Sequence, residues 1–291
     1  MRQAIEHYLM YIQVQKSYSD HTLTAYRNDL SQFLKFVSAD PDGVESWQDV
    51  DTDLILRYVL DLKDRQYAAA TVARKVASVK SFFHHLFKNG ILPDDPTATL
   101  DSPRVKRRRP KVLSEQDVDR LLAQPAKDSS AKGLRDRAIL ELLYGTGMRA
   151  SELVALTLDD VNLASWTVRV RTRRVKDEQI INMGQRAAAA VEAYLEQGRL
   201  EMVRDPQQRA LFLNPWGRPL TRQGLWLLFK EYVEKAGLSR DVSPHTLRHT
   251  FARHALDRGT DLKDVKEMLG HSSISSTRVY ARLSDKRRDT R

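Results

Sequence analysis

Apolar residues recur every three or four positions through most of the first 90 residues. This spacing predicts helices over about residues 20–37, 54–62 and 71–88, each with one apolar face. Ser19-Asp20-His21-Thr22 offers capping residues to the first of these helices, and Asn89-Gly90 ends the last. Stripes of this kind are typical of helices that pack on one side, so we interpret them as the core of a helical domain.

The helical pattern stops near residue 91 and gives way to prolines and positive charges. Four prolines between residues 93 and 110 disfavour a helix interior. Residues 104–111 also carry six positive charges, a composition typical of a solvated linker that can touch phosphate. We therefore predict a helical domain at residues 1–105, a basic linker at 106–112 and a second domain at 113–291.

The second domain mixes helical spacing with a short region of strict alternation. Helices are expected at about residues 114–124, 134–144, 150–156, 185–201, 222–236, 245–257, 261–269 and 273–282. Between them, strands are expected at about residues 161–163, 166–172 and 179–183. The fold class predicted for the whole chain is mainly α with a small antiparallel β-sheet, in two domains.

The composition of this 291-residue chain limits which cellular environment and which class of binding partner we expect. It has no cysteine and a net charge of +10, and its isoelectric point is about 9.7. No apolar run approaches the roughly 18 residues of a membrane span, and the first residues do not resemble a signal peptide. We expect a cytoplasmic protein whose partner is nucleic acid and not a membrane. A soluble basic protein without a polyanionic partner is the alternative on charge alone.

Five residues of the second domain form an ordered set suited to metal-free attack on a phosphodiester: Arg149, His245, Arg248, His271 and Tyr280. An attacking oxygen creates a pentavalent phosphorus whose non-bridging oxygens gain negative charge. Fixed cations stabilise that state more than the ground state. A tyrosine phenol has an ordinary pKa of about 10, so arginines and an imidazole would have to help it lose its proton.

Local sequence predicts how part of this set is presented. Arg149 follows Gly145-Thr146-Gly147, in which two glycines permit a sharp turn before a helix. Ser243-Pro244 predicts the start of another helix, because serine is a good N-cap and proline a good first residue. On that helix His245 and Arg248 lie one turn apart and share a face.

The histidines also raise the alternative of a metal site. His245 and His249 have the spacing of two ligands on one helix, and His254 would be a third. However, no glutamate follows His245 as in the metalloprotease motif. We therefore predict no metal, and we interpret His249 as a packing or capping residue.

Together these residues resemble the tyrosine recombinase (phage integrase) family, most closely its Xer-type members. The likeness covers nearly the whole chain. Its motifs are Tyr-Ser-x-His-Thr-Leu-x-Ala-Tyr-x-x-Asp-Leu at 18–30, Gly-Thr-Gly-Met-Arg-Ala-Ser-Glu-Leu at 145–153, Pro-His-Thr-Leu-Arg-His-Thr-Phe-Ala at 244–252 and Leu-Gly-His-Ser-Ser-Ile-x-x-Thr-x-x-Tyr at 269–280. The resemblance implies a helical-bundle core-binding domain and an α+β catalytic domain that form a C-shaped DNA clamp.

The resemblance also implies a role for each residue of the set. Tyr280 would be the nucleophile that forms a 3′-phosphotyrosyl bond, and Arg149 and Arg248 would hold the scissile phosphate. His245 would assist proton transfer and His271 would hydrogen-bond a phosphate oxygen. Glu152 would be a supporting residue behind them. Neither ATP nor a metal cofactor is implied, because the covalent intermediate keeps the energy of the phosphodiester bond.

Two features depart from the family pattern. The family places a catalytic lysine in a β-hairpin that is often rich in glycine, whereas residues 170–178 contain no glycine. Arg174 stands at the usual lysine position, yet Lys176 is the one lysine in this hairpin. We favour Lys176 as general acid, because an arginine is a poor proton donor, and keep Arg174 as the alternative. The other departure is the short charged segment of residues 281–291, where relatives often extend a helix.

The expected function is site-specific recombination through a Holliday junction, with resolution of chromosome or plasmid dimers first. Integration or excision of a mobile element, a type IB topoisomerase-like activity and a catalytically silent DNA-binding protein are the alternatives. The resemblance implies a double-stranded DNA site, a homo-tetramer or a hetero-tetramer with a paralogous recombinase, and possible control by a DNA translocase. Basic residues expected to contact DNA are Arg74, Lys80, Arg104, Lys106, Arg107, Arg108, Arg109 and Lys111.

Overall fold

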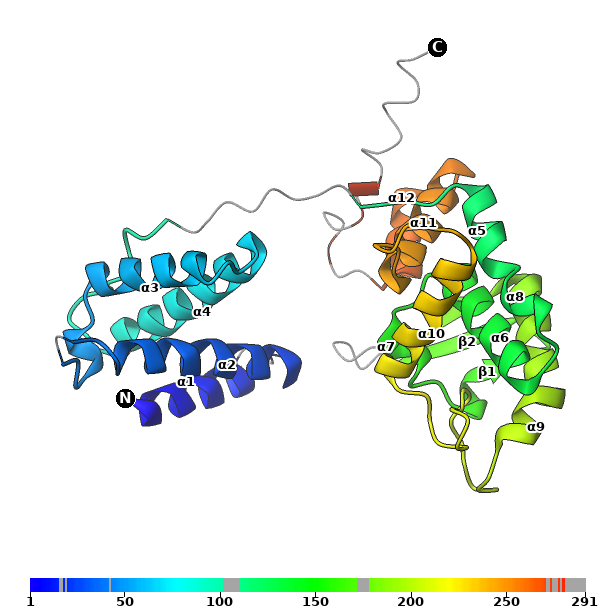
Figure 1. The fold of residues 1–291 in the computed structure, drawn as a ribbon, viewed down its shortest axis with the longest axis horizontal. Helices are drawn as coiled ribbons and strands as arrows, with labels where there is room; N and C mark the ends of the chain where they lie inside the picture. The colour runs from blue at the N-terminus through cyan, green and yellow to red at the C-terminus, as the bar shows by residue number, and fades with distance from the viewer. Residues whose placement is uncertain are drawn as a thin grey trace, which may run out of the picture. The chain divides into compact units, whose positions relative to one another are not determined.

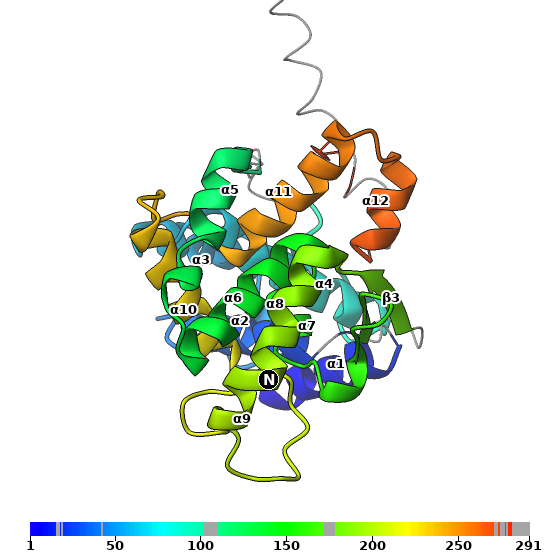
Figure 2. The same cartoon turned by 90° about the vertical axis from the view of Figure 1, so that its right-hand side faces the viewer.

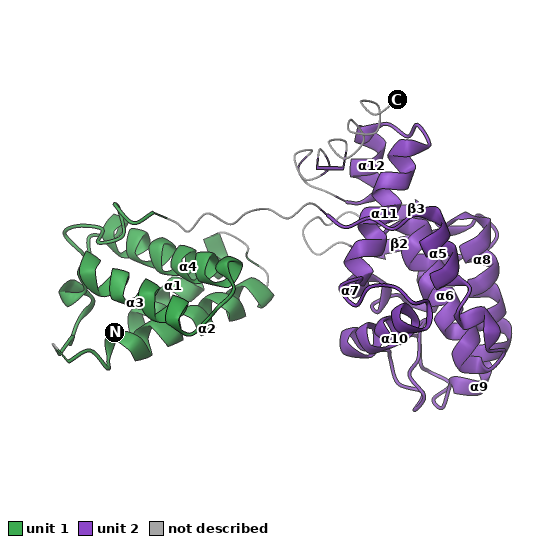
Figure 3. Cartoon of the chain, turned by 45° about the horizontal axis from the view of Figure 1, so that its top comes forward, with its two compact units in different colours: residues 1–108 green, residues 109–291 purple. Residues whose placement is uncertain are grey.

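The computed structural model describes residues 1–15, 18, 20–41, 43–101, 110–171, 178–270, 273, 277 and 279–280. The chain forms two compact units, residues 1–108 and residues 109–291 (Figure 3). Figure 1 shows the helices and strands of each unit along the chain. The two units are described separately below.

Within its described residues, unit 1 is a bundle of four helices. They are α1 (Arg2–Gln15), α2 (Asp20–Val37), α3 (Thr52–Asp64) and α4 (Ala69–Lys88), and a 3₁₀ turn lies at Trp47–Asp49. Each helix buries one stripe of apolar side chains and exposes the opposite side, as its spacing predicts. The centre is aromatic: Trp47 packs against Phe33, Phe82 and Phe83 with ring centroids 4.9–6.1 Å apart.

A buried carboxylate links α2 to α4. Asp29 is 1% exposed and accepts hydrogen bonds from Lys75 Nζ at 3.0 Å and from Ser78 Oγ at 3.0 Å. The guanidinium of Arg74 pairs with the other side of the same carboxylate. A buried charge is tolerated only when it is paired in this way, so the two helices are held in one register.

Unit 2 contains the small sheet and most of the helices. The helices are α5 (Glu115–Leu122), α6 (Ala131–Thr146), α7 (Ala150–Leu153), α8 (Gly184–Ala193), α9 (Arg199–Met202), α10 (Arg222–Lys235), α11 (Pro244–Asp257) and α12 (Leu262–Met268). A π-helical turn at Tyr194–Gly198 joins α8 to α9, and 3₁₀ turns lie at Pro125–Lys127 and Leu158–Asp160. Figures 1 and 2 both show α11 and α12 side by side.

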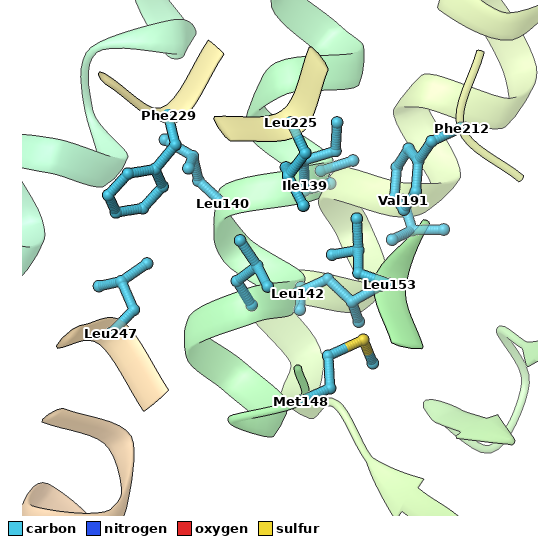
Figure 4. Close-up of a cluster of buried hydrophobic side chains, with 14 of the residues drawn as sticks. Ile139, Leu140, Leu142, Met148, Leu153, Val191, Phe212, Leu225, Phe229 and Leu247 are labelled. Atoms are coloured by element: carbon cyan, nitrogen blue, oxygen red, sulfur yellow. The ribbon is translucent and has the colours of Figure 1, made fainter. Parts of the chain in front are cut away.

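Helix α6 runs through the middle of unit 2. Ala138, Ile139, Leu140, Leu142 and Leu143 are each at most 1% exposed, and the polar residues Arg135, Asp136 and Glu141 of the same helix are buried as well. A helix buried on so many sides must be covered by several elements, and α8 and α11 are among those that pack on it. Side chains from α6, α7, α8, α10 and α11 meet in this core (Figure 4).

In the part of unit 2 that the structure describes, the sheet has three antiparallel strands in the order β1-β2-β3. They are β1 (Val161–Asn162), β2 (Thr167–Arg171) and β3 (Glu178–Asn182). Val168 pairs with Ile181, and both side chains are buried in the core. On the other face of β2, Arg169 and Arg171 reach the buried carboxylate of Asp160 at 3.3 and 3.1 Å.

The first residues of unit 2 are fastened to α11. The backbone N–H of Leu113 donates to Thr250 Oγ1 at 3.0 Å, and its carbonyl accepts from His254 Nε2 at 3.1 Å. In the neutral ring, His254 Nδ1 then accepts from the hydroxyl of Tyr144 at 2.9 Å. Leu113 is therefore held to α11 through both of its backbone polar groups.

The predicted fold class is confirmed, since the described residues are mainly helical with one small antiparallel sheet. Two local predictions were wrong. The helix predicted at 134–144 continues through Gly145 to Thr146, and the helix predicted at 150–156 ends at Leu153. Gly145 lies inside α6, where a Cβ would be 2.6 Å from the Met183 carbonyl oxygen, so the role of this glycine is to permit close packing. No helix within the described ranges is long and apolar enough to cross a membrane.

Candidate active site

Arg149 lies two residues after Gly147, a glycine with a left-handed backbone conformation. Gly147 follows α6 with φ +62°, and its N–H donates to the Leu143 carbonyl at 3.0 Å. Arg149 then becomes the N-cap residue of α7. Glu152, three residues on, accepts from the backbone N–H of Arg149 at 2.7 Å and from its Nη1 at 2.6 Å. The carboxylate therefore fixes both the start of the helix and the direction of the guanidinium.

Helix α11 begins as predicted. Ser243 is the N-cap, Pro244 is the first helical residue, and Ser243 and Thr246 exchange side-chain to backbone hydrogen bonds. This start places His245, Arg248 and His249 on one side of the helix. The rings of His245 and His249 lie nearly parallel, with centroids 6.4 Å apart.

Arg248 is buried and held at several points. It is 4% exposed, and its guanidinium donates to the carbonyls of Gly147, at 2.7 Å, and Leu269. Its Nη1 also lies 4.0 Å from a carboxylate oxygen of Glu152. Burial and the charge of Arg149 lower the pKa of Arg248 to about 10, which leaves it a cation at neutral pH. Glu152 thus stands between the two arginines.

Tyr280 lies near the cations Arg149 and Arg248, and its side chain is buried. It is 3% exposed and packs with Ala252 of α11 and with Val265 and Leu269 around α12. Its hydroxyl is 2.7 Å from Nδ1 of His249. Burial raises the pKa of Tyr280, and the charges of Arg248 and then Arg149 oppose that rise. The arginines favour the phenolate as expected, but desolvation outweighs them.

Both histidines on this side of α11 are kept neutral at pH 7. Desolvation lowers the pKa of His245, and the charges of Arg248, Arg149 and Arg222 lower it further. Desolvation likewise lowers the pKa of His249, with added effects of His245 and Arg248. A neutral imidazole can accept a proton, so both rings are in the form that a base requires.

Three of the residues expected in the site lie outside the described residues: His271, Lys176 and its alternative Arg174. The hairpin that carries positions 174 and 176 is described up to Arg171 and from Glu178. Its base is fastened by Asp160, which accepts from both Arg169 and Arg171. On the other strand, Gln179 donates through Nε2 to the Glu267 carbonyl at the end of α12.

The basic residues expected to touch DNA are also placed in part. Arg74 pairs with Asp29, and Lys80 Nζ donates to the Leu100 carbonyl at 2.5 Å. Lys111 forms an ion pair of 2.7 Å with Asp241. The other members of the set, Arg104, Lys106, Arg107, Arg108 and Arg109, lie outside the described residues.

The arrangement around the histidines differs from a metal centre. Both ring nitrogens of His254 are engaged with Tyr144 and Leu113, so this ring faces away from His245 and His249. Within the described ranges, no three His, Asp or Glu side chains gather as metal ligands would. Two cations beside a phenol and two neutral imidazoles are instead suited to phosphoryl transfer from a diester to the phenol oxygen.

Sequence reasoning missed two residues that contact Tyr280. His249 was interpreted as a packing or capping residue, yet it bonds the phenol directly. Arg253, one turn further along α11, donates through Nη1 to the Tyr280 carbonyl at 3.3 Å. The available signal was their spacing, because His245, His249 and Arg253 follow each other at intervals of four on one helix face.

The chain thus has a mainly helical unit followed by an α+β unit in which two arginines lie near a buried tyrosine, an arrangement suited to attack on a phosphodiester. The model of the phage integrase family matches residues 111–287, and that of the phage integrase N-terminal SAM-like domain matches residues 5–90. The chain therefore belongs to the phage integrase family, whose members are the tyrosine recombinases: enzymes that break and rejoin DNA strands.

Among relatives, the tyrosine recombinase XerC of Herpetosiphon aurantiacus is 45% identical over 99% of this chain and 92% of its own length. The tyrosine recombinase XerD of Oceanobacillus iheyensis is 36% identical over 98% of this chain and 95% of its own length. Among solved structures, the XerH site-specific recombinase in a post-cleavage complex with its difH substrate has a TM-score of 0.76. It is 22% identical and the match covers 92% of this chain and 78% of that one, which supports the fold.

Proposed function

We propose that this chain is a Xer-type site-specific recombinase that cuts and rejoins double-stranded DNA through a 3′-phosphotyrosyl intermediate. The observation that supports it best is that Arg149, Arg248 and Tyr280, which come from distant parts of the chain, lie close together. Glu152 ties Arg149 to the same place as Arg248, and Tyr280 lies close enough to both arginines for their charges to oppose the rise in its pKa that burial causes. Each of these groups has a distinct task in attack on a phosphodiester.

The scissile phosphate binds between the guanidiniums of Arg149 and Arg248. Both carry fixed hydrogen-bond donors, so little reorganisation is needed as negative charge grows on the non-bridging oxygens. Glu152 keeps the two cations close in the absence of DNA, because its carboxylate offsets their repulsion. His271 adds a hydrogen bond to the same phosphate.

Proton transfer completes the cleavage step. The Oη of Tyr280 gives its proton to an imidazole as it forms a bond to phosphorus, the bond from phosphorus to the 5′-oxygen breaks, and the leaving oxygen takes up a proton from a general acid. Lys176 is the preferred donor of that proton, with Arg174 as the alternative, and His245 assists on the phosphate side. A 5′-hydroxyl from a second strand reverses these steps and releases the tyrosine, so no ATP is consumed.

The full reaction needs two DNA sites and four protomers that exchange strands in pairs. We propose that both units contact the duplex and that basic residues of the segment between them contact its phosphates. Either a homo-tetramer or a hetero-tetramer with a paralogous recombinase is consistent with likeness to both XerC and XerD proteins. Because phosphate contacts release counterions, DNA binding should weaken steeply with salt; a flat salt response would contradict these phosphate contacts.

Resolution of chromosome or plasmid dimers is the biological role that we favour over integration of a mobile element. The XerC and XerD relatives share 36–45% of residues with this chain across at least 97% of it. The phage lambda integrase and the Tn1549 transposon integrase share 17–20%. Recombinant products between two sites, as opposed to relaxation of supercoils alone, distinguish the recombinase from a topoisomerase-like enzyme.

Capture of the covalent intermediate tests the proposal. The protein, alone and mixed with a paralogous recombinase from the same genome, is incubated with a library of nicked duplexes in which cleavage releases a short fragment. After denaturation in SDS, covalent protein–DNA adducts are recovered and sequenced. Adducts are expected with the native protein and with Tyr11→Phe, a control in unit 1, but not with Tyr280→Phe. Adducts with Tyr280→Phe, or none with native protein under either condition, would contradict the proposal.

A further inference from the structure

Tyr280 is held at two points by one face of α11. Its hydroxyl is 2.7 Å from Nδ1 of His249, and its carbonyl accepts from Nη1 of Arg253 at 3.3 Å. Arg253 is itself fixed by Asp257, which accepts from Nε at 2.8 Å and lies 2.7 Å from Nη2. The backbone contact therefore sets the position of the tyrosine, and the side-chain contact sets the direction of its hydroxyl.

The phenolic proton has a defined acceptor. Tyr280 is 3% exposed, so bulk water does not surround its hydroxyl. His249 faces the Tyr280 phenol, His245 and Arg248. Desolvation, His245 and Arg248 all lower the pKa of His249, so they favour its neutral ring. A neutral histidine that accepts at Nδ1 carries its own proton on Nε2. The phenol therefore donates and the imidazole accepts, which is the ground state of a proton transfer.

We propose that His249 is a further catalytic residue: it takes the proton of Tyr280 during strand cleavage and returns it during rejoining. This inference rests on the proposed role of Tyr280 as nucleophile. As the bond from Oη to phosphorus forms and the bond to the 5′-oxygen breaks, the phenolic proton moves to Nδ1 of His249. The proton for the leaving 5′-oxygen comes from the separate general acid, so both transfers balance and no oxidant or metal takes part.

The surroundings make this transfer reversible, as recombination requires. The imidazolium formed on His249 lies near the Arg248 cation, which makes it a strong acid that gives its proton back readily. The phosphate bound by the arginines stabilises it most in the transition state, when the non-bridging oxygens carry the most negative charge. His245 is more exposed than His249, so in this scheme His245 is the histidine that assists proton transfer at the phosphate.

The pH dependence of a single cleavage event tests this role. Single-turnover cleavage of a nicked duplex is measured between pH 5 and pH 9.5 for the native protein and for His249→Gln. The native rate should be level at neutral pH and fall in acid, where His249 is protonated. The variant should be about 10²- to 10⁴-fold slower at pH 7, the usual contribution of a general base. Its rate should rise roughly tenfold per pH unit, because solvent hydroxide must then remove the proton.

Rescue by a more acidic phenol separates chemistry from positioning. With trifluorotyrosine at position 280, a phenol of lower pKa, His249→Gln should regain much of its rate. Arg253→Gln is the matched control: it loses the backbone contact, so it should cleave more slowly with the native pH profile and gain nothing from the acidic phenol. Urea unfolding of each variant verifies that it is folded, and His249→Asn replaces His249→Gln if needed.

The outcomes keep the two proposals apart. Adducts formed by Tyr280→Phe would overturn the assignment of the nucleophile itself. If the native protein forms adducts, the assignment of Tyr280 as nucleophile stands. The role of His249 is overturned if His249→Gln cleaves as fast as the native protein or faster. It is also overturned if this variant cleaves more slowly but keeps the native pH profile and is not rescued by the more acidic phenol.

Discussion

Replacing Gly147 by alanine should destabilise unit 2 and displace Arg248 from the site. Gly147 has φ +62°, a left-handed conformation that costs an alanine roughly 1–2 kcal/mol. A Cβ at this position would also lie 2.3 Å from Cδ1 and 2.9 Å from Cγ of Phe251. Such overpacking against a ring on α11 costs about 1–3 kcal/mol, so the total loss should be about 2–5 kcal/mol.

The same change should slow DNA cleavage. The carbonyl of Gly147 accepts the hydrogen bond from Arg248 at 2.7 Å, so a shift of this turn moves the carbonyl away from the guanidinium. A hydrogen bond to a charged group contributes roughly 1.5–3 kcal/mol. Its loss in the transition state corresponds to a cleavage rate about 10- to 100-fold lower.

Two other glycines of unit 2 provide matched controls. Gly184 has φ +76° and Gly237 has φ +66°, and a Cβ at either position would meet no atom within 4 Å. Alanine at these sites should cost only the backbone part, about 1–2 kcal/mol. Urea unfolding followed by tryptophan fluorescence measures all three variants, and nicked-duplex cleavage measures the active-site effect.

A double variant tests the source of the loss. In a Phe251→Ala background the ring is gone, so adding Gly147→Ala should cost no more than the control glycines do. Equal losses for Gly147→Ala and the controls, or an undiminished cost in the Phe251→Ala background, would refute the reasoning from the contact with Phe251.

Three further results are expected. Glu152→Gln should lower the cleavage rate about 10- to 100-fold while the urea midpoint changes little, because an amide cannot bind both guanidiniums with a full negative charge; a loss of stability without a loss of rate would contradict this. Asp29→Ala should destabilise unit 1 by about 3–5 kcal/mol by leaving Lys75 buried without its partner, and an unchanged circular-dichroism melt would count against it. Because the pKa of His245 and that of His249 are lowered on folding, the unfolded chain binds more protons just below pH 6.5, so the free energy of unfolding should fall as the pH drops through that value. Glutamine at both positions should flatten that slope, and an equal slope would be evidence of another titrating group.

The helices and the small sheet could be predicted because each depends on neighbouring residues. The 3.6-residue spacing of α2 and α4, the N-cap at Ser243 and the alternation of Thr167–Arg171 are local signals. Gly145 was misread for the same reason: a glycine inside a helix is identical in sequence to one in a turn. Only its distance to the Met183 carbonyl, 38 positions away, shows that it permits close packing.

The site shows the same limit. Arg149, Arg248 and Tyr280 were identified by motif, but their mutual effects depend on burial that no spacing reports. The sequence suggested that arginines would lower the pKa of Tyr280, whereas burial raises it. The contact with His249 joins residues 31 positions apart through the packing of Tyr280 beside α11, so local sequence could not distinguish it from ordinary packing.

The attachment of Leu113 to α11 has a mechanical consequence. Thr250 and His254 bind both backbone polar groups of Leu113, directly after the segment that joins the two units. A pull on that segment would therefore reach α11 through these two hydrogen bonds, as well as Asp241 through Lys111 and the core through the side chain of Leu113. Since α11 carries His245 and Arg248 and contacts Tyr280, such a pull would act directly on the helix whose residues we propose to perform the chemistry.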